Sequence, residues 1–179
     1  MKNQRLNRFI RRGGVIAYPT ESCFGLGCDP KNRKAINKII KLKKRSLNKN
    51  FILIGSSTKQ FDYFINPFND ATKKNLFSKW PGPHTWVITA NNRCPNWLKS
   101  NSKIALRISS FSPCQILTES LGMAITSSSL NLSGKIPLKN YRDVCRFLPK
   151  QVKLFKGRIG QNKRPSVIQD FQTKKIIRS

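Results

Sequence analysis

The sequence has few acidic residues. It contains seven Asp and Glu residues against 35 Lys and Arg residues, for a formal net charge of +28. Such a charge attracts polyanions such as RNA, DNA and nucleotides. The basic residues are spread along the chain, so compositional drift toward lysine is an open explanation for part of the excess. The shortage of carboxylates argues against a metal site built only from protein oxygen ligands.

Histidine and paired cysteines are also scarce. His84 is the only histidine, and the five cysteines include no CxxC pair: Cys23, Cys28, Cys94, Cys114 and Cys145. A Cys/His zinc site is therefore not supported. We expect reduced, mostly structural thiols, since Cys23 has no neighbouring histidine to activate it as a nucleophile. His84 either touches a ligand or packs beside a strand.

Long apolar runs and the standard nucleotide-binding loops are missing. No stretch of 18 apolar residues occurs, and the basic N-terminal segment lacks the apolar centre of a signal peptide. We therefore expect no membrane span and a cytoplasmic location. Neither a Walker loop nor a GxGxxG motif is present, so a standard nucleotide fold is not predicted.

Hydrophobic periodicity predicts one mixed α/β (α+β) domain over residues 1–179. Helices are expected at 3–12, 31–43, 59–65, 68–79, 112–121 and 140–148, with Ile116, Leu117 and Leu121 facing the core in the fifth. Strands are expected at 15–18, 51–54, 85–90, 104–108, 123–126 and 152–155, and residues 166–170 and 175–178 are expected to form a hairpin.

Residues 15–30 are the most informative stretch. A β-branched and aromatic run predicts a buried strand, which Pro19 ends. Polar residues 20–22 follow, then Gly25 and Gly27, which allow tight turns. Asp29 is the expected N-cap of the next helix, with Pro30 in its first turn. A polar strand end before a helix is a common ligand site in α/β proteins, and a plain strand-to-helix link is the alternative.

Two further polar clusters lie at the expected ends of elements. The basic run at 42–50 is either a solvated face or an anion site. The serine-rich run at 127–134 follows an apolar strand, which favours a polar pocket over a flexible linker. In addition, Arg107 stands within an apolar strand, which indicates a carboxylate or phosphate partner. The glycine-rich loop 157–165 is the expected mobile loop over the site.

Six strings in the sequence resemble the Sua5/YciO/YrdC family. They are YPTESCFGLGCDP (18–30), LKKR with a following lysine (42–49), WPGPHT (80–85), ALRIS (105–109), SSSLNLSG (127–134) and RPSVIQD (164–170). They occur in the order and spacing of the family along nearly the whole chain. The resemblance implies a twisted mixed β-sheet flanked by helices, with a basic concave face, and RNA binding.

The resemblance also implies threonylcarbamoyl-AMP synthase activity. L-threonine, bicarbonate and ATP would give threonylcarbamoyl-AMP and pyrophosphate. Partner proteins would then transfer the threonylcarbamoyl group to adenosine 37 of tRNAs that read ANN codons, forming t6A. The alternative from another functional class is a non-catalytic RNA-binding or ribosome-maturation module on the same fold.

The resemblance assigns roles to individual residues. By similarity, Lys43, Arg45, Lys49, Ser129 and Asn131 would bind ATP, and Thr20, Arg107, Ser127 and Ser166 would surround the threonine. Lys43 and Arg45 would carry the catalysis by offsetting the repulsion between a carbamate and the α-phosphate. Arg107 would hold the threonine carboxylate as a bidentate fork. Mg²⁺ would bind through the ATP phosphates, with no metal site on the protein.

Four residues depart from the family pattern. Ser22 replaces the second threonine of PTET, and Ser46 stands where proline is usual. His84 replaces an apolar residue or tyrosine, and Leu130 replaces a small residue between Ser129 and Asn131. Overpacking beside a pocket commonly costs about 1–3 kcal/mol, so Leu130 is the departure expected to matter most.

Overall fold

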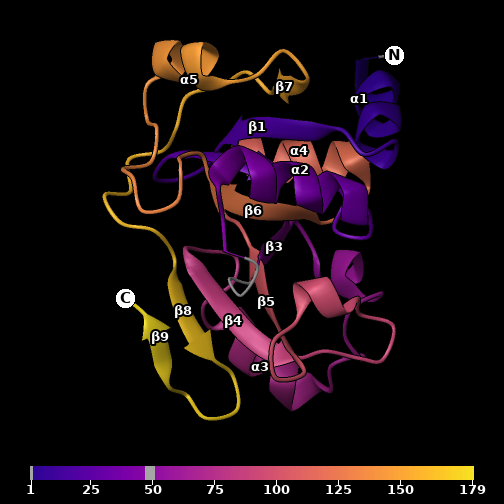
Figure 1. Ribbon diagram of the computed structural model, residues 1–179. Helices are drawn as coiled ribbons and strands as arrows, with labels where there is room; N and C mark the ends of the chain where they lie inside the picture. The colour runs from indigo at the N-terminus through magenta and orange to yellow at the C-terminus, as the bar shows by residue number, and fades with distance from the viewer. Residues whose placement is uncertain (1, 47–50) are drawn as a thin grey trace.

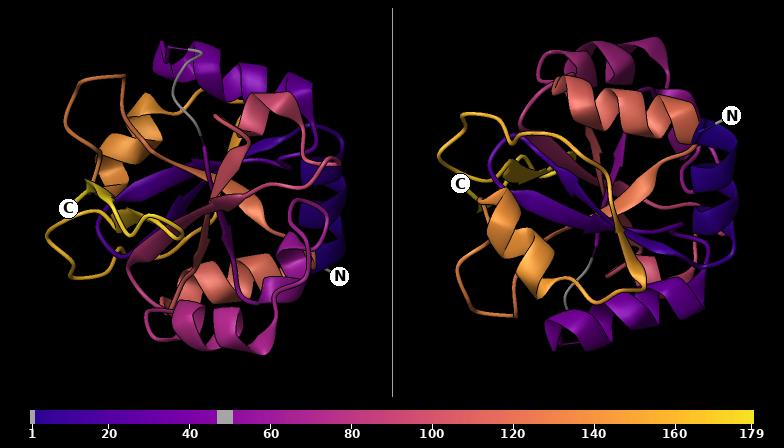
Figure 2. Two further views of the ribbon diagram at one scale, coloured as in Figure 1. Left: turned by 90° about the horizontal axis from the view of Figure 1, so that it is seen from below. Right: turned by 90° about the horizontal axis from the view of Figure 1, so that it is seen from above.

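The computed structural model describes residues 2–46 and 51–179, with residues 2 and 3 described by their backbone only. The described residues form one nine-stranded mixed sheet in the order β7-β1-β2-β6-β3-β5-β4-β8-β9. The helices are α1 (Lys2–Arg11), α2 (Arg33–Lys43), α3 (Asp70–Phe77), α4 (Ser112–Leu121) and α5 (Tyr141–Phe147), with short 3-10 turns η1 (Thr58–Phe61) and η2 (Asn96–Leu98). The views in Figures 1 and 2 show the strongly twisted sheet with helices packed around it. The expected mixed α/β architecture is confirmed.

The strands differ in direction across the sheet. They are β1 (Val15–Pro19), β2 (Phe24–Gly27), β3 (Ile52–Gly55), β4 (His84–Thr89), β5 (Lys103–Ile108), β6 (Ile125–Ser129), β7 (Val152–Leu154), β8 (Val167–Asp170) and β9 (Ile176–Arg178). The pairs β1–β7, β3–β5 and β4–β8 are parallel, and the other neighbouring pairs are antiparallel. The expected hairpin at the C-terminal end is confirmed as β8–β9.

Alternate side chains of β1 point to opposite faces of the sheet and pack in two separate hydrophobic clusters. Val15 and Ala17 pack in the cluster that contains the apolar side of α2. Ile16 and Tyr18 pack in a second cluster with Leu117 and other residues of α4, which α1 also joins. Because side chains alternate along a strand, this single buried run supplies both cores, and all five of its residues are buried.

The structure corrects the expected course of residues 20–33. Instead of turns leading directly into a helix, Phe24–Gly27 form β2, antiparallel to β1. Gly27 is required there, because a Cβ would lie 2.7 Å from the Thr126 carbonyl oxygen on the neighbouring strand. The helix begins only at Arg33, and its N-cap is Asn32, whose side chain accepts from the Ala35 N–H. Asp29 instead accepts from the Lys31 N–H in the preceding turn.

Three smaller expectations were wrong. The helix expected at 59–65 is only a 3-10 turn, η1, over Thr58–Phe61. The β6 strand lies at 125–129, two to three residues later than expected, so the serines after it belong partly to the strand. Ile116 does not face the core, since 54% of its surface is exposed, whereas Leu117 and Leu121 are buried as expected. In the part of the chain that the structure describes, no helix has the length and apolar character needed to cross a membrane.

Candidate active site

A large pocket lies on the sheet face that α4 covers only in part. In the pairing of β3 with β6, Ile54 lies opposite Ile125, and both pack in the cluster of α4. Two residues away along the same two strands, Ile52 lies opposite Ser127. From Ser127 the row continues through Ile52, Ala105 and Val87 to Asp170. These five residues line a pocket of about 830 Å³, which we call the strand-end pocket. Ordinary strand pairing thus forms its floor.

Most of the residues assigned by resemblance meet in this pocket. Thr20, Arg45, Arg107, Ser127, Ser129 and Ser166 all line it. Lys43 and Asn131 are buried and are not part of its lining. Lys49 lies outside the described residues. The pocket therefore joins β1, the end of α2, β5, β6 and the start of β8.

Lys43 is buried behind residues 129–131, which we call the SxN segment after Ser129 and Asn131, rather than presented to a ligand. Lys43 is 1% exposed, and its ammonium donates to the Ser129 carbonyl oxygen, the Asn131 carbonyl oxygen at 2.9 Å and Asn131 Oδ1 at 3.0 Å. An ammonium has three donors, so all are used within the protein. Burial and the nearby Arg45 charge lower the pKa of Lys43 to about 8.

Asn131 completes this network. Its Oδ1 also accepts from Ser129 Oγ at 2.6 Å, and its amide nitrogen donates to the Leu132 and Lys135 carbonyl oxygens. The SxN pair is therefore a closed turn held by Lys43. Ser129 lines the pocket, whereas Asn131 is buried and supports Ser129 through this hydrogen bond.

Of the two cations Lys43 and Arg45, Arg45 is the one that lines the pocket. Its Nη1 lies 3.5 Å from Ser128 Oγ, and its guanidinium stacks 5.1 Å from the centre of the Phe51 ring. Burial lowers its pKa, as desolvation disfavours the charged form. A partly desolvated guanidinium in a pocket is suited to an anionic group.

Arg107 is held by a partner that sequence reasoning missed. Its Nη2 donates to Glu21 Oε1 in a buried ion pair, and its Nε donates to the Gly82 carbonyl oxygen at 2.9 Å. Ser109 Oγ also donates to Glu21 Oε1, at 2.5 Å. Glu21 Oε2 is buried without a hydrogen-bond partner among the described residues. The pair fixes the guanidinium at the pocket wall.

The C-terminal hairpin adds a further cation that was not expected. Arg178 of β9 lines the pocket, and its Nη2 donates to the Ser166 carbonyl oxygen at 2.8 Å and to Ser166 Oγ at 3.2 Å. Ser166 Oγ also lies 2.8 Å from Thr85 Oγ1. Lys103, Lys139 and Lys163 line the same pocket. The only sequence signal for these residues was the general basic excess.

The glycine-rich loop 157–165 lies against the end of β1. The Gly160 N–H donates to the Thr20 carbonyl oxygen at 2.9 Å, and the Asn162 N–H donates to the Glu21 carbonyl oxygen at 3.0 Å. Lys163 and Pro165 then reach the pocket lining. The loop thus links the hairpin to the segment that carries Thr20 and Glu21.

Replacing Gly160 by valine should detach this loop. A Cβ at Gly160 would lie 2.7 Å from the Glu21 carbonyl oxygen and 2.9 Å from its Cα, and both are backbone atoms that cannot move aside. We expect faster proteolysis within 157–165, measured by limited digestion, with global unfolding changed little. Gln161→Val is the control, since Gln161 is the exposed neighbour of Gly160 in the same loop. Equal protection of Gly160→Val and the native chain would contradict the prediction.

The departures from the family pattern lie mostly outside the lining. The Leu130 side chain is fully buried in the core cluster beside α2 and does not line the pocket. His84 packs against Trp86, with ring centres 4.3 Å apart, and burial lowers its pKa. This favours the packing role for His84. Ser22 does line the pocket.

The thiols show no sign of activation. All five cysteines are free, and only Cys145 is exposed. Cys23 lines the pocket, but burial raises its pKa. A raised thiol pKa lowers the thiolate fraction that a nucleophile needs.

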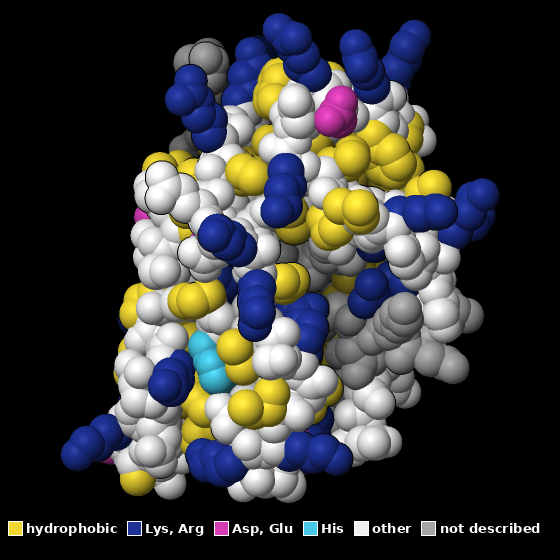
Figure 3. Space-filling view, turned by 90° about the vertical axis from the view of Figure 1, so that its left-hand side faces the viewer, with side chains coloured by type: hydrophobic (Ala, Val, Ile, Leu, Met, Phe, Trp, Pro, Cys, Tyr) yellow, Lys and Arg dark blue, Asp and Glu magenta, His cyan; other side chains and the backbone are white. Residues whose placement is uncertain are grey.

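The pocket offers few ligands for a metal ion. Within residues 2–46 and 51–179, no group of three or more His, Cys, Asp or Glu side chains could hold one. Asp170 lines the pocket but pairs with Lys103 at 2.6 Å and accepts from two backbone N–H groups, and these bonds lower its pKa to about 2. Glu21 is engaged by Arg107. Six Lys and Arg residues line the pocket against one acidic residue, Asp170. The face in Figure 3 carries many Lys and Arg side chains and few acids.

The sequence matches a known family over nearly its whole length. The Sua5_yciO_yrdC family model, which carries the description "Telomere recombination", matches residues 8–179. A protein of Methylobacillus flagellatus named threonylcarbamoyl-AMP synthase is 41% identical over 179 residues, covering 99% of both chains. A protein of Wigglesworthia glossinidia brevipalpis with the same name is 40% identical, covering 99% of this chain and 95% of its own.

Solved structures share the fold. Sua5 of P. abyssi, in a crystal structure complexed with L-threonine, aligns with a TM-score of 0.84 at 24% identity over 94% of this chain, which spans half of that protein's length. YciO of E. coli aligns with a TM-score of 0.83 at 24% identity, over 99% of this chain and 88% of its own. At this identity the likeness concerns the fold.

Proposed function

The chain belongs to the Sua5/YciO/YrdC family, and from this premise we propose that it is a threonylcarbamoyl-AMP synthase whose reaction takes place in the strand-end pocket. The observation that carries the proposal is the convergence of Thr20, Arg45, Arg107, Ser127, Ser129 and Ser166 on one pocket. These residues are far apart in the sequence, and the family pattern assigned them without knowledge of the pocket. The substrates would be L-threonine, bicarbonate and ATP, and the product serves t6A formation in tRNA.

The threonine end of the pocket would lie around Arg107. The guanidinium is fixed by Glu21 and Gly82, so it is preorganised for a carboxylate, and binding a fixed fork costs little entropy. Thr20, Ser127 and Ser166 supply oxygen atoms at the same wall. The Thr20 hydroxyl donates to the Cys23 carbonyl oxygen at 2.7 Å, so it would meet a substrate as an acceptor, which suits an ammonium or hydroxyl group.

The ATP end would lie around Arg45 and Ser129. Arg45 would contact the phosphates directly. Lys43 would act as a positioning residue, since its three donors hold the segment that presents Ser129. Lys49 remains an expected phosphate ligand by resemblance. Lys139 and Lys163 add positive charge to the lining.

The reaction needs two anions to approach each other. The threonine amine and bicarbonate form a carbamate with loss of water. A carbamate oxygen then attacks the α-phosphorus of ATP and displaces pyrophosphate. Fixed cations around this point lower the repulsion in the transition state, because they act in a site with little water. Among the described residues no side chain is placed as a general base, so positioning and electrostatics would supply the rate enhancement.

Mg²⁺ would enter as part of the nucleotide substrate. Hard cations of this kind commonly bind through substrate phosphates with few protein carboxylates, and both carboxylates near the pocket already have cationic partners. The metal would neutralise phosphate charge. No step is assigned to a protein-bound metal.

The partners and place of action belong to the same proposal. The product is a reactive mixed anhydride, so proteins that transfer the threonylcarbamoyl group to tRNA would act next, in the cytoplasm. The alternative of a non-catalytic RNA-binding module is not favoured. RNA binding alone needs positive charge and offers no reason for the paired networks around Arg107 and Ser129.

The test is pyrophosphate release from ATP and bicarbonate in the presence of Mg²⁺. Release should depend on L-threonine and be much lower with L-serine. Arg45→Ala should raise the KM for ATP about tenfold or more, since one charge-assisted contact is worth roughly 1.5–3 kcal/mol. Arg33→Ala is the control, because this arginine lies exposed at the start of α2, the helix that Arg45 follows. Release that is independent of threonine, or equal loss in both variants, would refute the proposal.

A further inference from the structure

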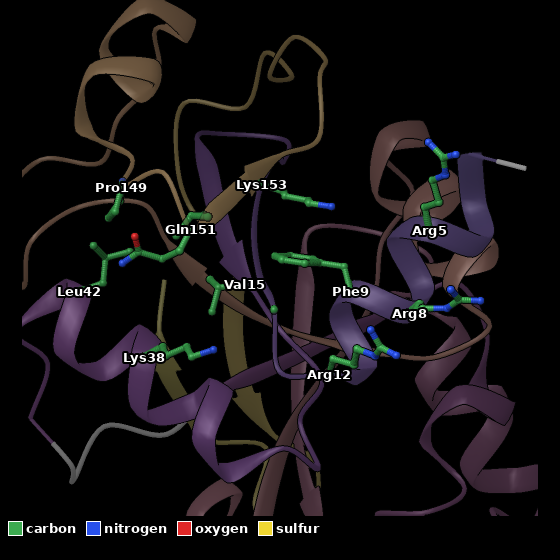
Figure 4. A pocket seen from close by; sticks show the side chains of 12 residues that line it. Arg5, Arg8, Phe9, Arg12, Val15, Lys38, Leu42, Pro149, Gln151 and Lys153 are labelled. Atoms are coloured by element: carbon green, nitrogen blue, oxygen red, sulfur yellow. The ribbon is translucent and has the colours of Figure 1, made fainter.

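A second cavity lies between α1, α2 and β7, apart from the strand-end pocket. It has a volume of about 500 Å³ and shares no lining residue with that pocket. Figure 4 shows it from close by: the side chains come from α1 on one side, from α2 on the other, and from the segment around β7 above. We call it the α1–α2 cavity. The proposed synthase reaction does not use it.

The interior of the cavity is apolar. Phe9, Val15, Leu42 and Val152 line it, and Phe9 points from α1 into the space between the two helices. The Phe9 ring lies close to the backbone of Gly14, where a Cβ would come within 2.3 Å of the ring. Glycine therefore allows the ring to lie flat against the chain. The half-buried ring is a surface on which a planar group can stack.

Positive charges surround this apolar interior. Arg5, Arg8 and Arg12 of the α1 segment, Lys38 of α2 and Lys153 of β7 all line the cavity. No acidic side chain lines it, and none of the five forms an ion pair with any side chain that the structure describes. The Lys38 ammonium donates to the Gly13 carbonyl oxygen at 2.8 Å, and no carboxylate among the described residues balances the five charges.

One lysine already occupies the stacking position. The Lys153 ammonium lies 4.3 Å from the centre of the Phe9 ring. Such cation–π contacts at exposed sites are weak, so an incoming planar group can displace the ammonium. The displaced ammonium would remain within reach of the same ligand. The ring and the charge are thus arranged for a ligand that has both a flat apolar part and an anionic part.

We propose that the α1–α2 cavity binds a nucleotide unit of a single-stranded RNA. The base would stack on Phe9, and the phosphates on either side would contact the cations of α1 and Lys153. Base stacking on an aromatic side chain beside a positively charged track is the usual chemistry of single-strand binding. Five cations exceed what the phosphate of one mononucleotide requires, and they extend along both sides of the cavity, which favours a strand.

Fluorescence anisotropy with a labelled single-stranded oligoribonucleotide tests the proposal. Arg8→Ala/Lys153→Ala removes one cation of α1 and the ammonium that lies over the Phe9 ring. It should reduce the steepness of log K against log salt by about 1.4, which is the value for two lost phosphate contacts on a single strand. Phe9→Leu should weaken binding by between about fivefold and a hundredfold, the range for one lost stack.

Matched variants at the far end of the molecule serve as controls. Lys59→Ala/Lys74→Ala removes the same charge, and Phe77→Leu makes the same change at an exposed phenylalanine of α3. Both should leave RNA affinity nearly unchanged, and thermal unfolding checks that every variant is folded. Pyrophosphate release by Arg8→Ala/Lys153→Ala should equal that of the native chain, so failure here is distinct from failure of the synthase proposal.

Three outcomes would overturn the proposal. Equal losses in the cavity and control variants would mean that RNA senses only the net charge. Binding of ADP at this cavity as tight as that of the oligoribonucleotide would assign it to free nucleotides. Equally tight binding of poly-glutamate with the same dependence on Phe9 would assign it to an acidic protein.

Discussion

Replacing Glu21 by alanine should lower the free energy of unfolding by about 3–5 kcal/mol, the usual cost of leaving one member of a buried ion pair without its partner. Arg107 is 8% exposed, and its guanidinium would lose the carboxylate that balances its charge. Ser109 would lose the same acceptor. Urea unfolding followed by tryptophan fluorescence measures the change.

Two control variants distinguish the lost charge from general damage. Glu21→Gln keeps the shape and one oxygen acceptor, so its loss of stability should be smaller. Asp70→Ala removes a carboxylate from an exposed pair with Lys73 and should change stability by less than about 1 kcal/mol. If Glu21→Ala is no less stable than Asp70→Ala, the pair does not hold Arg107. In the synthase assay, Glu21→Gln should raise the KM for threonine more than that for ATP.

Replacing Lys43 by methionine should lower pyrophosphate release by about a hundredfold or more. Methionine fills a similar volume but removes the Lys43 donor from three oxygen atoms of Ser129 and Asn131. Asn131 Oδ1 keeps its bond from Ser129 Oγ, whereas the two carbonyl oxygens lose the ammonium. Each buried group left without its partner costs about 1–3 kcal/mol, so the SxN segment should rearrange. The loss should appear in the KM for ATP as well as in kcat, because Ser129 faces the pocket from that segment.

The dependence of pyrophosphate release on pH tests the positioning role of Lys43, because a side chain that only filled space would not make release depend on its protonation. Burial and the Arg45 charge lower the pKa of Lys43 to about 8. Release should fall as the pH rises through about 8, since a neutral amine has one donor fewer. Arg45→Ala removes the second cause and should shift this fall to higher pH. An unchanged profile would contradict the positioning role.

The lowered pKa of Lys43 also affects the stability of the fold. Here the effect of rising pH is favourable, whereas it is unfavourable for pyrophosphate release. Between pH 8 and the ordinary lysine pKa of 10.5, the unfolded chain binds the Lys43 proton more strongly than the folded chain does. The contribution of this group to the free energy of unfolding therefore rises with pH across that window. Below pH 8 the full penalty of burying the charged ammonium applies.

Several elements could be predicted because their signals are local. The apolar run of β1, the amphipathic stripe of α2 and the two halves of the β8–β9 hairpin each carry their pattern within a few residues. The strand β2 carries none, since two of its four residues are glycine. Gly27 serves the close approach of β6, which only the assembled sheet reveals. The Asn32 cap was missed because Asp29 and Pro30 form a nearer helix-start pattern.

The residues of the candidate site likewise divide into those that the sequence could indicate and those whose contacts depend on the fold. Resemblance supplied the residues of the pocket, but a sequence cannot pair Glu21 with Arg107, which lie 86 positions apart. Lys43 stands in a basic run that is typical of a solvated surface, and it is buried because the end of α2 packs against the SxN segment. The hydrogen-bond partners of Lys43 lie 86 and 88 positions away. Contacts of this range depend on topology rather than on local pattern.

The order of strands has a consequence for how the protein is made on the ribosome. The first strand lies between β2 and β7, whose residues are 152–154. The strand-end pocket takes one wall from residues near 20 and another from Arg178. An emerging nascent chain can close the β1–β2 hairpin early, but the outer edge of β1 stays unpaired until more than 150 residues have been synthesised. The complete pocket must therefore await the synthesis of Arg178, and the exposed edge in the meantime is a site where chaperones would be needed.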